Sequence, residues 1–409
     1  MQHDPDIVAR QTGSDVASRG SNQSGMRAYN ERLVLSLVRQ SGALAKAEIA
    51  RKTGLSAQTV SVIMRALEAD GLLERGEPVR GRIGQPSVPF SLAREGALFL
   101  GLTVGRRSLD LVLTNFVGDV KHRVRHSHPY PTPDGTVAFT LDAIQQTFAQ
   151  LSEAQQQRVA GLGIALPFQL WAWADTLGVD EADMRDWQHR DIALEIGQAC
   201  DFPVFVCNDA SAACGAELVF GTPDKPRDFL YFFVGFFIGG GLVIDSSLYT
   251  GSSGNAAALG SMCVPAPDGR LRQLVDVASL ATLETEIRSG DAGGSMQWQH
   301  PENWTLPAGP LDTWMTNAAR GIGHAILSSV CLIDVSHVLI DGWMPAAMRA
   351  DLVQRIRTHV SSNSVAGIQV PDVLEGSIGS DARALGAASL PLSERFLVER
   401  KTFLKGLAR

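Results

Sequence analysis

Gln58, Ser61 and Arg65 are the first residues in the chain whose types and spacing could form a binding surface. At about 100° per residue they fall on one side of a helix, together with Val62. Amide, hydroxyl and guanidinium groups on one exposed face match the hydrogen-bonding groups of base edges and phosphates in a major groove. This pattern predicts contact with double-stranded DNA, and the alternative is an ordinary helical hairpin with a solvated polar face.

Two arginines further along the chain could also contact DNA. Arg80 and Arg82 lie in a glycine-rich stretch between two short β-like runs, at 72–75 and 88–92. Glycines let the backbone approach a phosphate closely, and the arginines supply positive charge or enter a minor groove. We therefore expect a β-hairpin whose tip contacts DNA, which is called a wing.

The helix that carries Gln58, Ser61 and Arg65 must be held in place by a second helix. Ala50 is small enough for two helices to approach, and Gly54 suits a left-handed turn between them. Ser56 can cap the helix that follows the turn, and Asn30 can cap a further helix upstream. The buried side of the helix after the turn is expected to be apolar and comprises Val60, Ile63, Met64 and Leu67.

Together these elements predict a winged helix-turn-helix domain over residues 26–92. Its candidate DNA contacts are Ser56, Gln58, Thr59, Ser61, Arg65, Arg80, Arg82 and Gln85. The segment holds ten Lys and Arg against six Asp and Glu, whereas the whole chain carries a net charge of −7. A basic module attached to an acidic body is the arrangement expected of a DNA reader with a separate sensing domain.

The rest of the chain has the composition of a large folded domain. Of its 409 residues 45% are hydrophobic and 19% are charged, which suits a sizeable buried core. No apolar run approaches the roughly 18 residues needed to span a bilayer. Residues 1–25 are rich in Ser, Gly, Asp and Gln and predict a flexible tail. The five cysteines form no CxxC pair, so we expect reduced thiols.

Short apolar runs alternate with helix-like stretches after residue 93, which predicts an α/β fold with mixed sheets covered by helices. Candidate strands are 99–104, 109–115, 159–166, 203–207, 229–234, 242–245 and 337–341. Candidate helices are 135–153, 189–200, 209–219, 311–333, 346–361 and 380–389. The first two strands read as a hairpin that ends near Gly118, which favours a ribonuclease-H-like lobe over a doubly wound dinucleotide-binding fold.

Asn208 and Asp209 are candidates for a ligand site in this body. They end one predicted strand and open a predicted helix, so both side chains project from the C-terminal edge of a sheet, where α/β folds bind ligands. Pro167 and Gln169 follow the predicted strand 159–166 and are expected to border the same cleft. The alternative for Asn208 and Asp209 is a helix cap kept for stability.

Several short motifs occur in one order along some 300 residues of the chain. They are GRIGQP at 81–86, GLGIALP at 161–167, PVFVCNDASAA at 203–213, IGGGLVID at 238–245 and LGAA at 385–388. In these motifs the chain resembles the ROK family of repressors and sugar kinases, and specifically its transcriptional regulators. The resemblance implies a two-lobed, actin-like sugar-kinase fold over residues 93–409, with effector-sensing and oligomerisation roles. In family kinases the residue matching Asp209 takes the proton of a sugar hydroxyl, and the residue matching Asn208 bonds a neighbouring hydroxyl.

At several positions that match the motifs of family kinases, this chain carries residues that do not suit kinase chemistry. Family kinases carry an Asp-x-Gly-Gly-Thr loop, and the matching positions begin with Thr103 and end with Arg106 and Arg107. In the family's second phosphate loop, Phe236 and Phe237 stand where a hydroxyl and a glycine are found. We therefore expect no catalytic residue and no enzymatic activity. The two arginines could bind an anion, but a solvated surface pair is favoured.

The residues that match the family's zinc and sugar ligands are also changed. The zinc-binding His position is Ser261, and the matching cysteine stretch at 267–275 contains no cysteine. Two sugar-gripping acids match Ala258 and Val275, and each lost carboxylate removes a hydrogen bond worth about 1.5–3 kcal/mol. We predict no metal and no cofactor.

These observations predict a DNA-binding transcriptional regulator, a repressor of carbohydrate-related genes, whose kinase-like domain senses a sugar or sugar derivative without catalysis. We expect a homodimer or homotetramer on a roughly palindromic operator. Two alternatives stay open: a sugar kinase with a fused DNA-binding module, and a regulator whose vestigial cleft is controlled by a protein partner. We expect the protein in the bacterial cytoplasm, on the nucleoid when bound to its operator, and not at a membrane.

Overall fold

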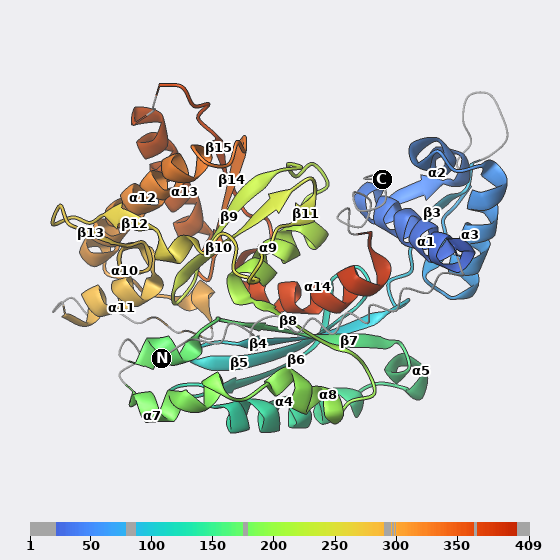
Figure 1. Cartoon of the computed structure of the whole chain (residues 1–409), viewed down its shortest axis with the longest axis horizontal. Helices are drawn as coiled ribbons and strands as arrows, with labels where there is room; N and C mark the ends of the chain where they lie inside the picture. The colour runs from blue at the N-terminus through green and yellow to red at the C-terminus, as the bar shows by residue number, and fades with distance from the viewer. Residues whose placement is uncertain are drawn as a thin grey trace.

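The structure is a computed structural model that describes residues 22–78, 87–174, 179–289, 296, 298, 300–363 and 366–398. Figure 1 shows a small N-terminal unit beside two α/β lobes. Helix α14 (Ala382–Phe396) lies between the lobes and extends toward the N-terminal unit. This helix is therefore the element that joins all three parts.

The N-terminal unit is a winged helix. Its elements are α1 (Asn22–Ser41), β1 (Ala43–Ala45), α2 (Lys46–Thr53), α3 (Ala57–Ala69), β2 (Leu73–Arg75) and β3 (Pro89–Leu92). Strand β3 lies between β1 and β2 in an antiparallel sheet, so the two strands that flank the wing are paired. The expectation that Asn30 caps the first helix is wrong, because α1 already begins at Asn22. An ion pair between Arg27 and Glu31, one turn apart, supports this early start.

The first lobe contains a five-stranded mixed sheet with the order β6-β5-β4-β7-β8. Its strands are β4 (Leu98–Val104), β5 (Ser108–Thr114), β6 (Val120–Ser127), β7 (Val159–Leu166) and β8 (Val204–Asn208). The first three form an antiparallel meander, and β7 and β8 run parallel to β4. This opening meander agrees with the predicted hairpin and with a ribonuclease-H-like lobe.

Helices cover both faces of this sheet (Figure 1). One face carries α4 (Pro133–Phe148), α5 (Glu153–Gln156), the 3₁₀ turns η1 (Leu170–Trp173) and η2 (Arg185–Gln188), α7 (Glu181–Met184) and α8 (Ile192–Gln198). Helices α9 (Asp209–Phe220) and α14 lie on the opposite side, toward the second lobe. Because β4, β7 and β8 run parallel, their C-terminal ends lie at the same edge of this sheet.

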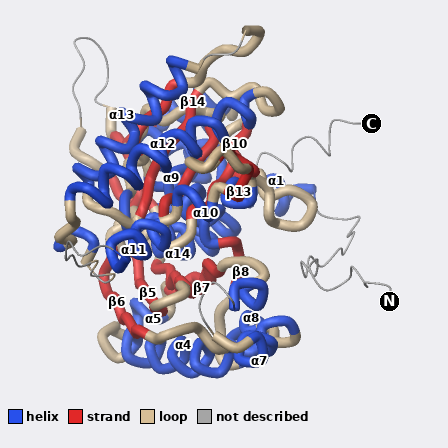
Figure 2. The backbone as a smooth tube through the Cα atoms, turned by 90° about the vertical axis from the view of Figure 1, so that its left-hand side faces the viewer, coloured by secondary structure: helices blue, strands red, loops and turns tan. Residues whose placement is uncertain are grey.

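The second lobe is built on a sheet with the order β11-β10-β9-β14-β15. Its strands are β9 (Phe229–Val234), β10 (Ile238–Ile244), β11 (Ser247–Leu248), β14 (His337–Gly342) and β15 (Asp372–Glu375), with a separate hairpin of β12 (Cys263–Pro265) and β13 (Leu271–Gln273). Its helices and turns are η3 (Leu259–Ser261), α10 (Val275–Ala278), α11 (Leu280–Ser289), η4 (Pro301–Asn303), α12 (Ala308–Val330), α13 (Ala346–Ser362) and η5 (Gly379–Asp381). Figure 2 shows α12 and α13 side by side on the outside of this lobe. In the described part of the chain, no helix is both long and apolar enough to cross a membrane.

Glycines let α14 pack directly on the sheet of the first lobe. A Cβ atom at Gly101 in β4 would lie 2.6 Å from the carbonyl oxygen of Ala384, which real side chains do not tolerate. Gly163 in β7 meets the backbone of Ala387 in the same way. The helix therefore sits at backbone contact distance from two central strands, and its position depends on that of the lobe.

The apolar core of the winged helix is continuous with that of the first lobe. One buried cluster contains Val38 and Val60 of the winged helix together with Phe99, Phe116 and Leu392 of the lobe and α14. The full cluster also includes residues from every helix and all three strands of the winged helix. The two units are therefore joined by a shared hydrophobic core and not by an exposed linker alone.

Candidate nucleic-acid interface and ligand cleft

The turn between α2 and α3 has the geometry of a helix-turn-helix. Gly54 has a φ of 72°, and its N–H donates to the carbonyl of Ala50 at 2.9 Å. Ser56 caps α3, because its Oγ accepts from the N–H of Thr59 at 3.1 Å. The buried side of α3 consists of Val60, Ile63, Met64 and Leu67, as predicted from the periodicity.

The opposite side of α3 faces solvent. Gln58 and Arg65 are exposed, while Thr59 and Ser61 are half-buried. Arg65 is partly fixed along the helix, because its Nε donates to the carbonyl of Ser61 at 3.2 Å. Val62 lies on the same side with 48% of its surface exposed, where it could meet a thymine methyl. The surface has the donors, acceptors and methyl groups that base edges require.

The strands that flank the wing are described, but its tip is not. The N–H of Gly76 donates to the carbonyl of Pro89 at 2.8 Å, which extends the pairing of β2 with β3. The predicted wing contacts Arg80, Arg82 and Gln85 lie outside the described residues. Their role stays a prediction.

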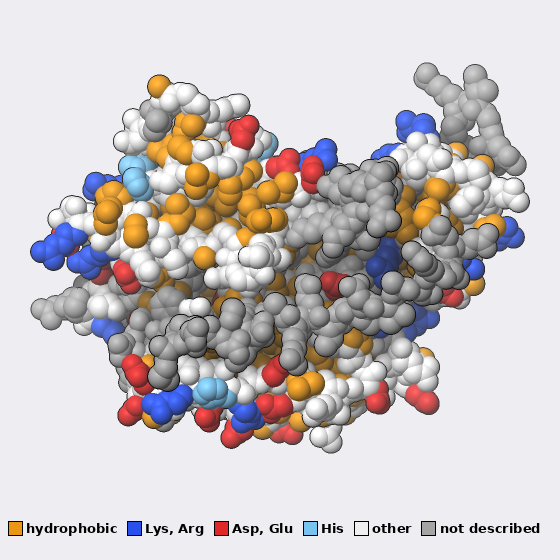
Figure 3. Space-filling view, in the orientation of Figure 1, with side chains coloured by type: hydrophobic (Ala, Val, Ile, Leu, Met, Phe, Trp, Pro, Cys, Tyr) orange, Lys and Arg blue, Asp and Glu red, His pale blue; other side chains and the backbone are white. Residues whose placement is uncertain are grey.

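Charge is unevenly distributed over the face shown in Figure 3. Lys and Arg side chains surround the winged helix, whereas Asp and Glu gather over the lower, first lobe. Arg51, Lys52 and Arg65 are all exposed on the winged helix. This distribution agrees with the charge difference read from the sequence and would attract a polyanion to the winged helix.

The structure brings the predicted ligand residues to one edge of the first sheet. Strands β7 and β8 are parallel neighbours, and Leu166 pairs with Asn208 at their C-terminal ends. Pro167 and Asp209 therefore follow paired positions. Asn208 caps α9, because its Oδ1 accepts from the N–H of Ala210 at 3.0 Å and from the next N–H at 3.2 Å. The capping interpretation of Asn208 thus describes what its side chain does in this structure.

The loop after β7 lies close to the second lobe. Pro167 is buried, and Gln169 is exposed with a φ of 54°, a left-handed conformation that is unusual for a residue other than glycine. Between them, the ring of Phe168 lies 3.4 Å from where a Cβ atom of Gly254 would be. The loop that carries two predicted ligand residues therefore reaches across the gap between the lobes.

Asp209 is paired with an arginine that the sequence did not suggest. Its Oδ2 lies 3.7 Å from Nη1 of Arg383, in the first turn of α14. The start of α14 is fixed by the buried carboxylate of Asp341, which accepts from the N–H of Gly379 at 2.9 Å and from the hydroxyl of Tyr231 at 3.2 Å. The second lobe therefore positions the cation that faces Asp209 of the first lobe.

The expectation that Arg106 and Arg107 form a solvated pair is wrong for Arg106. Only 7% of its surface is exposed, and its guanidinium lies 3.9 Å from the centre of the Phe237 ring. Arg107 lies over the Phe236 ring at 5.3 Å and forms an ion pair of 3.4 Å with Glu284. The aromatic residues of the β9–β10 turn thus cover the arginines of the β4–β5 turn.

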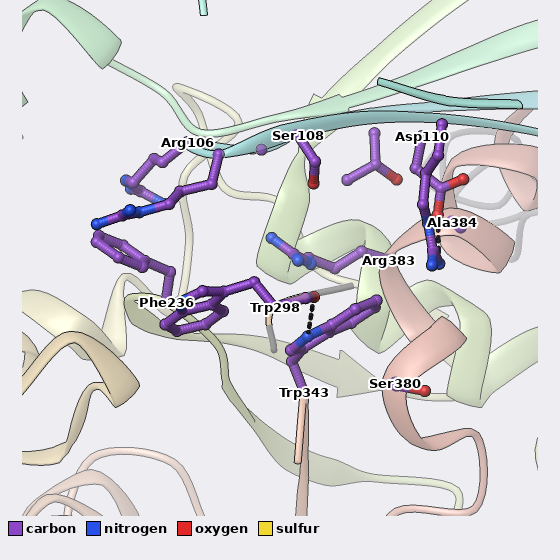
Figure 4. Close-up of a pocket in the computed structure, with 13 residues that line it drawn as sticks. Arg106, Ser108, Asp110, Phe236, Trp298, Trp343, Ser380, Arg383 and Ala384 are labelled. Carbon is purple, nitrogen blue, oxygen red and sulfur yellow. Dashed lines mark hydrogen bonds and ion pairs between the residues drawn. The ribbon is translucent and has the colours of Figure 1, made fainter. Parts of the chain in front are cut away.

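A cavity of about 50 Å³ lies where these turns and α14 meet (Figure 4). It is lined by Thr103, Gly105, Arg106, Arg107, Ser108, Asp110, Arg125, Phe236, Trp298, Trp343, Ser380, Arg383 and Ala384. None of the four predicted ligand residues lines it, although Arg383 connects it to Asp209. Sequence analysis missed Arg125, Trp298, Trp343 and Arg383, because no local motif links residues so far apart in the chain.

Burial shifts the pKa of two groups in this cavity. It lowers the pKa of Arg106 to about 10, although the nearby Asp209 carboxylate opposes that change. Burial also raises the pKa of Asp110, against the opposite effect of Arg123 and Arg125. The carboxylate of Asp110 is bonded to Arg125 at 3.1 Å. With a pKa of about 10, Arg106 stays protonated at neutral pH.

The glycine run that matches the family's phosphate loop lies inside a strand. Gly239, Gly240 and Gly241 belong to β10, and a Cβ atom at Gly239 would lie 2.7 Å from the Cβ atom of Ala210 in α9. These glycines allow α9 to approach the strand closely. Across the described part of the chain, no group of three His, Cys, Asp or Glu residues is arranged to hold a metal ion.

Two family patterns match separate parts of the chain. Residues 99–273 match the ROK family, and residues 29–83 match the MarR family. The first match covers the first lobe and part of the second, and the second match covers most of the winged helix. The division agrees with the two kinds of unit seen in the structure.

Similar proteins extend this result over most of the chain. The uncharacterized protein y4fQ of Sinorhizobium fredii is 26% identical over 377 residues, which cover 90% of this chain and 91% of that protein. A xylose repressor of Caldicellulosiruptor bescii is 22% identical over 294 residues, or 69% of this chain and 73% of the repressor. A solved ROK family transcriptional regulator, a homologue of the E. coli MLC protein, shares the fold with a TM-score of 0.66 at 21% identity, covering 91% of this chain and 97% of its own. The chain therefore carries a ROK family domain, matched over residues 99–273, and a MarR-type winged helix at its N-terminus.

Proposed function

We propose that this protein is a DNA-binding transcriptional regulator that represses carbohydrate-related genes. The observation that carries the proposal is the capped helix α3, whose Gln58, Ser61 and Arg65 side stays out of the core while its apolar side packs into the winged helix. Such a helix can enter a major groove with its polar side toward the bases. Similarity to a xylose repressor and to a ROK family regulator supports repression linked to a sugar.

Specific binding requires two winged helices on one duplex. A single α3 reaches only a few base pairs, so we propose a homodimer, or a homotetramer built from dimers. Two half-sites would then lie about one helical turn, or a multiple of it, apart. Light scattering of the full chain during size-exclusion chromatography measures this state directly.

A ligand in the cleft could change DNA affinity through α14. The first turn of this helix carries Arg383 next to Asp209, and its last turn carries Phe396 in the cluster that holds the winged helix. The segment after it bonds directly to α1, because the N–H of Val398 donates to Oγ of Ser36 at 3.1 Å. A ligand that changes the angle between the lobes would thus act on the winged helix through one rigid element.

A sugar kinase with a fused DNA-binding module is the competing function. Asp209, which matches the proton acceptor of family kinases, favours it. Against it, Asp209 faces Arg383, and bulky aromatic and arginine side chains stand in both turns in place of the small residues with which family kinases hold the phosphates of ATP. We infer that the protein does not phosphorylate sugars. Turnover of ATP with any member of a hexose and pentose panel, lost in Asp209→Asn, would establish the kinase instead.

The proposal is tested by selecting DNA with the full-length protein from a random duplex library. We expect enrichment of a roughly palindromic sequence with half-sites about 10 base pairs apart or at a multiple of that spacing. A duplex that carries this sequence should shift in a gel at protein concentrations far below those needed for a scrambled duplex. Absence of any enriched sequence, with folded protein recovered, would reject the proposal.

A further inference from the structure

The cavity between the lobes has an excess of cations. Four arginines line it, Arg106, Arg107, Arg125 and Arg383, but only one carboxylate, that of Asp110. They come from the β4–β5 turn, from β6 and from α14, so the first lobe and the interlobe helix together build the cluster. Figure 4 shows Arg383 extending between Ser108 and Trp298 toward the middle of the cavity.

The ion pairs between these arginines and nearby carboxylates are longer than usual. Glu284 lies 3.4 Å from Arg107, and Asp209 lies 3.7 Å from Arg383. Charge-assisted hydrogen bonds between these groups are usually about 2.7–2.9 Å long. Asp110 is nearer to its partner Arg125, at 3.1 Å, but it is also shared with Arg123. The two long pairs leave room for a stronger acceptor.

Aromatic rings orient the guanidinium groups. The ring of Phe237 lies 3.9 Å from Arg106, Phe236 lies 5.3 Å from Arg107, Trp343 lies 5.4 Å from Arg125, and Phe233 lies 5.4 Å from Arg383. Each guanidinium lies over an aromatic ring, and cation–π attraction holds it there. Such an arrangement favours a ligand that accepts hydrogen bonds at the edges of the guanidinium groups.

Among the buried polar atoms of the lining that make no hydrogen bond to the described residues are two donors. They are Oγ1 of Thr103 and Nε of Arg383. Thr103 is only 5% exposed, and it stands where family kinases carry an acid. Buried donors are almost always paired in proteins, so these two atoms point to an acceptor that the chain itself does not supply.

The size of the cavity limits what that acceptor is. A volume of about 50 Å³ is a few times the roughly 10–15 Å³ that holds one water. It suits one compact oxyanion and is far below the roughly 300–1,000 Å³ of pockets that enclose whole small molecules. The rest of a larger ligand would extend past Arg383 toward Asp209.

We propose that this cavity binds a phosphate group and that the effector of the regulator is a phosphorylated sugar. The first half of the proposal, phosphate binding, depends only on the cavity. The second half, a phosphorylated sugar as effector, rests on the proposed function. In this interpretation the phosphate displaces the long pairs of Arg107 and Arg383, and the sugar lies by Asp209 and the loop after β7. Binding then draws the β4–β5 turn and the start of α14 together.

Isothermal titration calorimetry on the full chain tests the site with inorganic phosphate. We expect saturable binding that becomes about 10- to 100-fold weaker in Arg383→Gln, the usual effect of losing one charge-assisted hydrogen bond. Thr103→Val, which nearly keeps the side-chain shape, should also weaken it. Arg355→Gln is the control, because this arginine is also paired on a helix, α13, outside the cavity. No saturable binding by the wild type, or equal binding by Arg383→Gln, would overturn the proposal.

The second half is tested by comparing glucose 6-phosphate and other pentose and hexose phosphates with the matching neutral sugars. Tighter binding of one sugar phosphate than of both inorganic phosphate and its neutral sugar supports a phosphorylated effector. Equal binding of all sugar phosphates and inorganic phosphate overturns that half and leaves a site for free phosphate. The DNA selection separates the two proposals: sequence-specific DNA binding without phosphate binding rejects only this inference, and phosphate binding without DNA binding rejects only the proposed function.

Discussion

Arg65 offers the most direct test at the scale of single residues. Its side chain is exposed on α3 and bonds only to the backbone of Ser61 among the contacts described above. Arg65→Ala should weaken binding to the selected operator by about 1–3 kcal/mol if the guanidinium reads a base edge. Folding should not change, because no buried contact is lost. Gel shifts with Arg270→Ala, an exposed arginine of the distant β12–β13 turn, give the control, and equal affinity of both variants would remove Arg65 from the interface.

His128 predicts a pH dependence of stability. Burial, helped by the neighbouring His126, lowers its pKa to about 4, whereas an unfolded histidine titrates near 6.5. As the pH falls from about 6.5 toward 4, the unfolded chain therefore binds a proton at this histidine that the folded chain does not bind. The contribution of His128 to the free energy of unfolding is fully present above pH 6.5 and is lost as the pH falls toward 4. Between pH 7 and 5 the free energy of unfolding should fall by about 1–2 kcal/mol more in the wild type than in His128→Phe. Urea unfolding at the two pH values measures the difference, and identical slopes would contradict it.

At the scale of elements, α3 depends on its buried side. Val60 is completely buried, so Val60→Asp places a charge in the core of the winged helix and should cost about 3 kcal/mol or more. Val62→Asp makes the same change two residues later, where 48% of the side chain is exposed, and should change stability by less than about 0.5 kcal/mol. Hydrogen exchange of the α1–α3 amides distinguishes the variants. Similar protection in both would mean that Val60 does not hold the helix.

Elements with local causes were predictable from the sequence. The two sides of α3 and its cap follow from residues within one or two turns, and strands 159–166 and 229–234 have the bounds that their apolar runs indicate. Strand β6 was missed because Val120–Ser127 is mostly charged and polar. Its pairing with β5, and not its own residues, makes it a strand.

The candidate ligand cleft was less predictable, because its contacts join distant parts of the chain. Asn208 and Asp209 were placed at a sheet edge correctly, but the pairing of Asp209 with Arg383 spans most of the body. Arg106 looked like a surface residue because Phe237, which covers it, belongs to another lobe. Periodicity reports the side of an element on which a residue lies, and it carries no information about what packs there from elsewhere.

At the scale of the whole molecule, α14 connects the space between the two lobes with the winged helix. The Phe396 ring packs against Phe99 at 5.7 Å and against Phe116 at 5.1 Å, next to the winged helix. Phe396→Ala should leave a cavity and destabilise this junction by about 2–3 kcal/mol, since the ring is half-buried. We expect faster amide exchange in α1 and a smaller effect of any ligand on DNA affinity. Phe202→Ala, which removes a ring packed on Phe148 in the first lobe, is the control and should leave α1 exchange unchanged.

The shared core also restricts how this protein could be re-engineered or diversified. A fragment cut at residue 92 would lose Phe99, Phe116 and Leu392, which complete the hydrophobic cluster around Val38. A chimaera that joins a foreign DNA-binding domain to this body must therefore also redesign the contact surface of the C-terminal helix. Without that change, an apolar patch would stay exposed to water and promote aggregation. Swapping operator preference is better attempted by changing single side chains on the outer surface of α3.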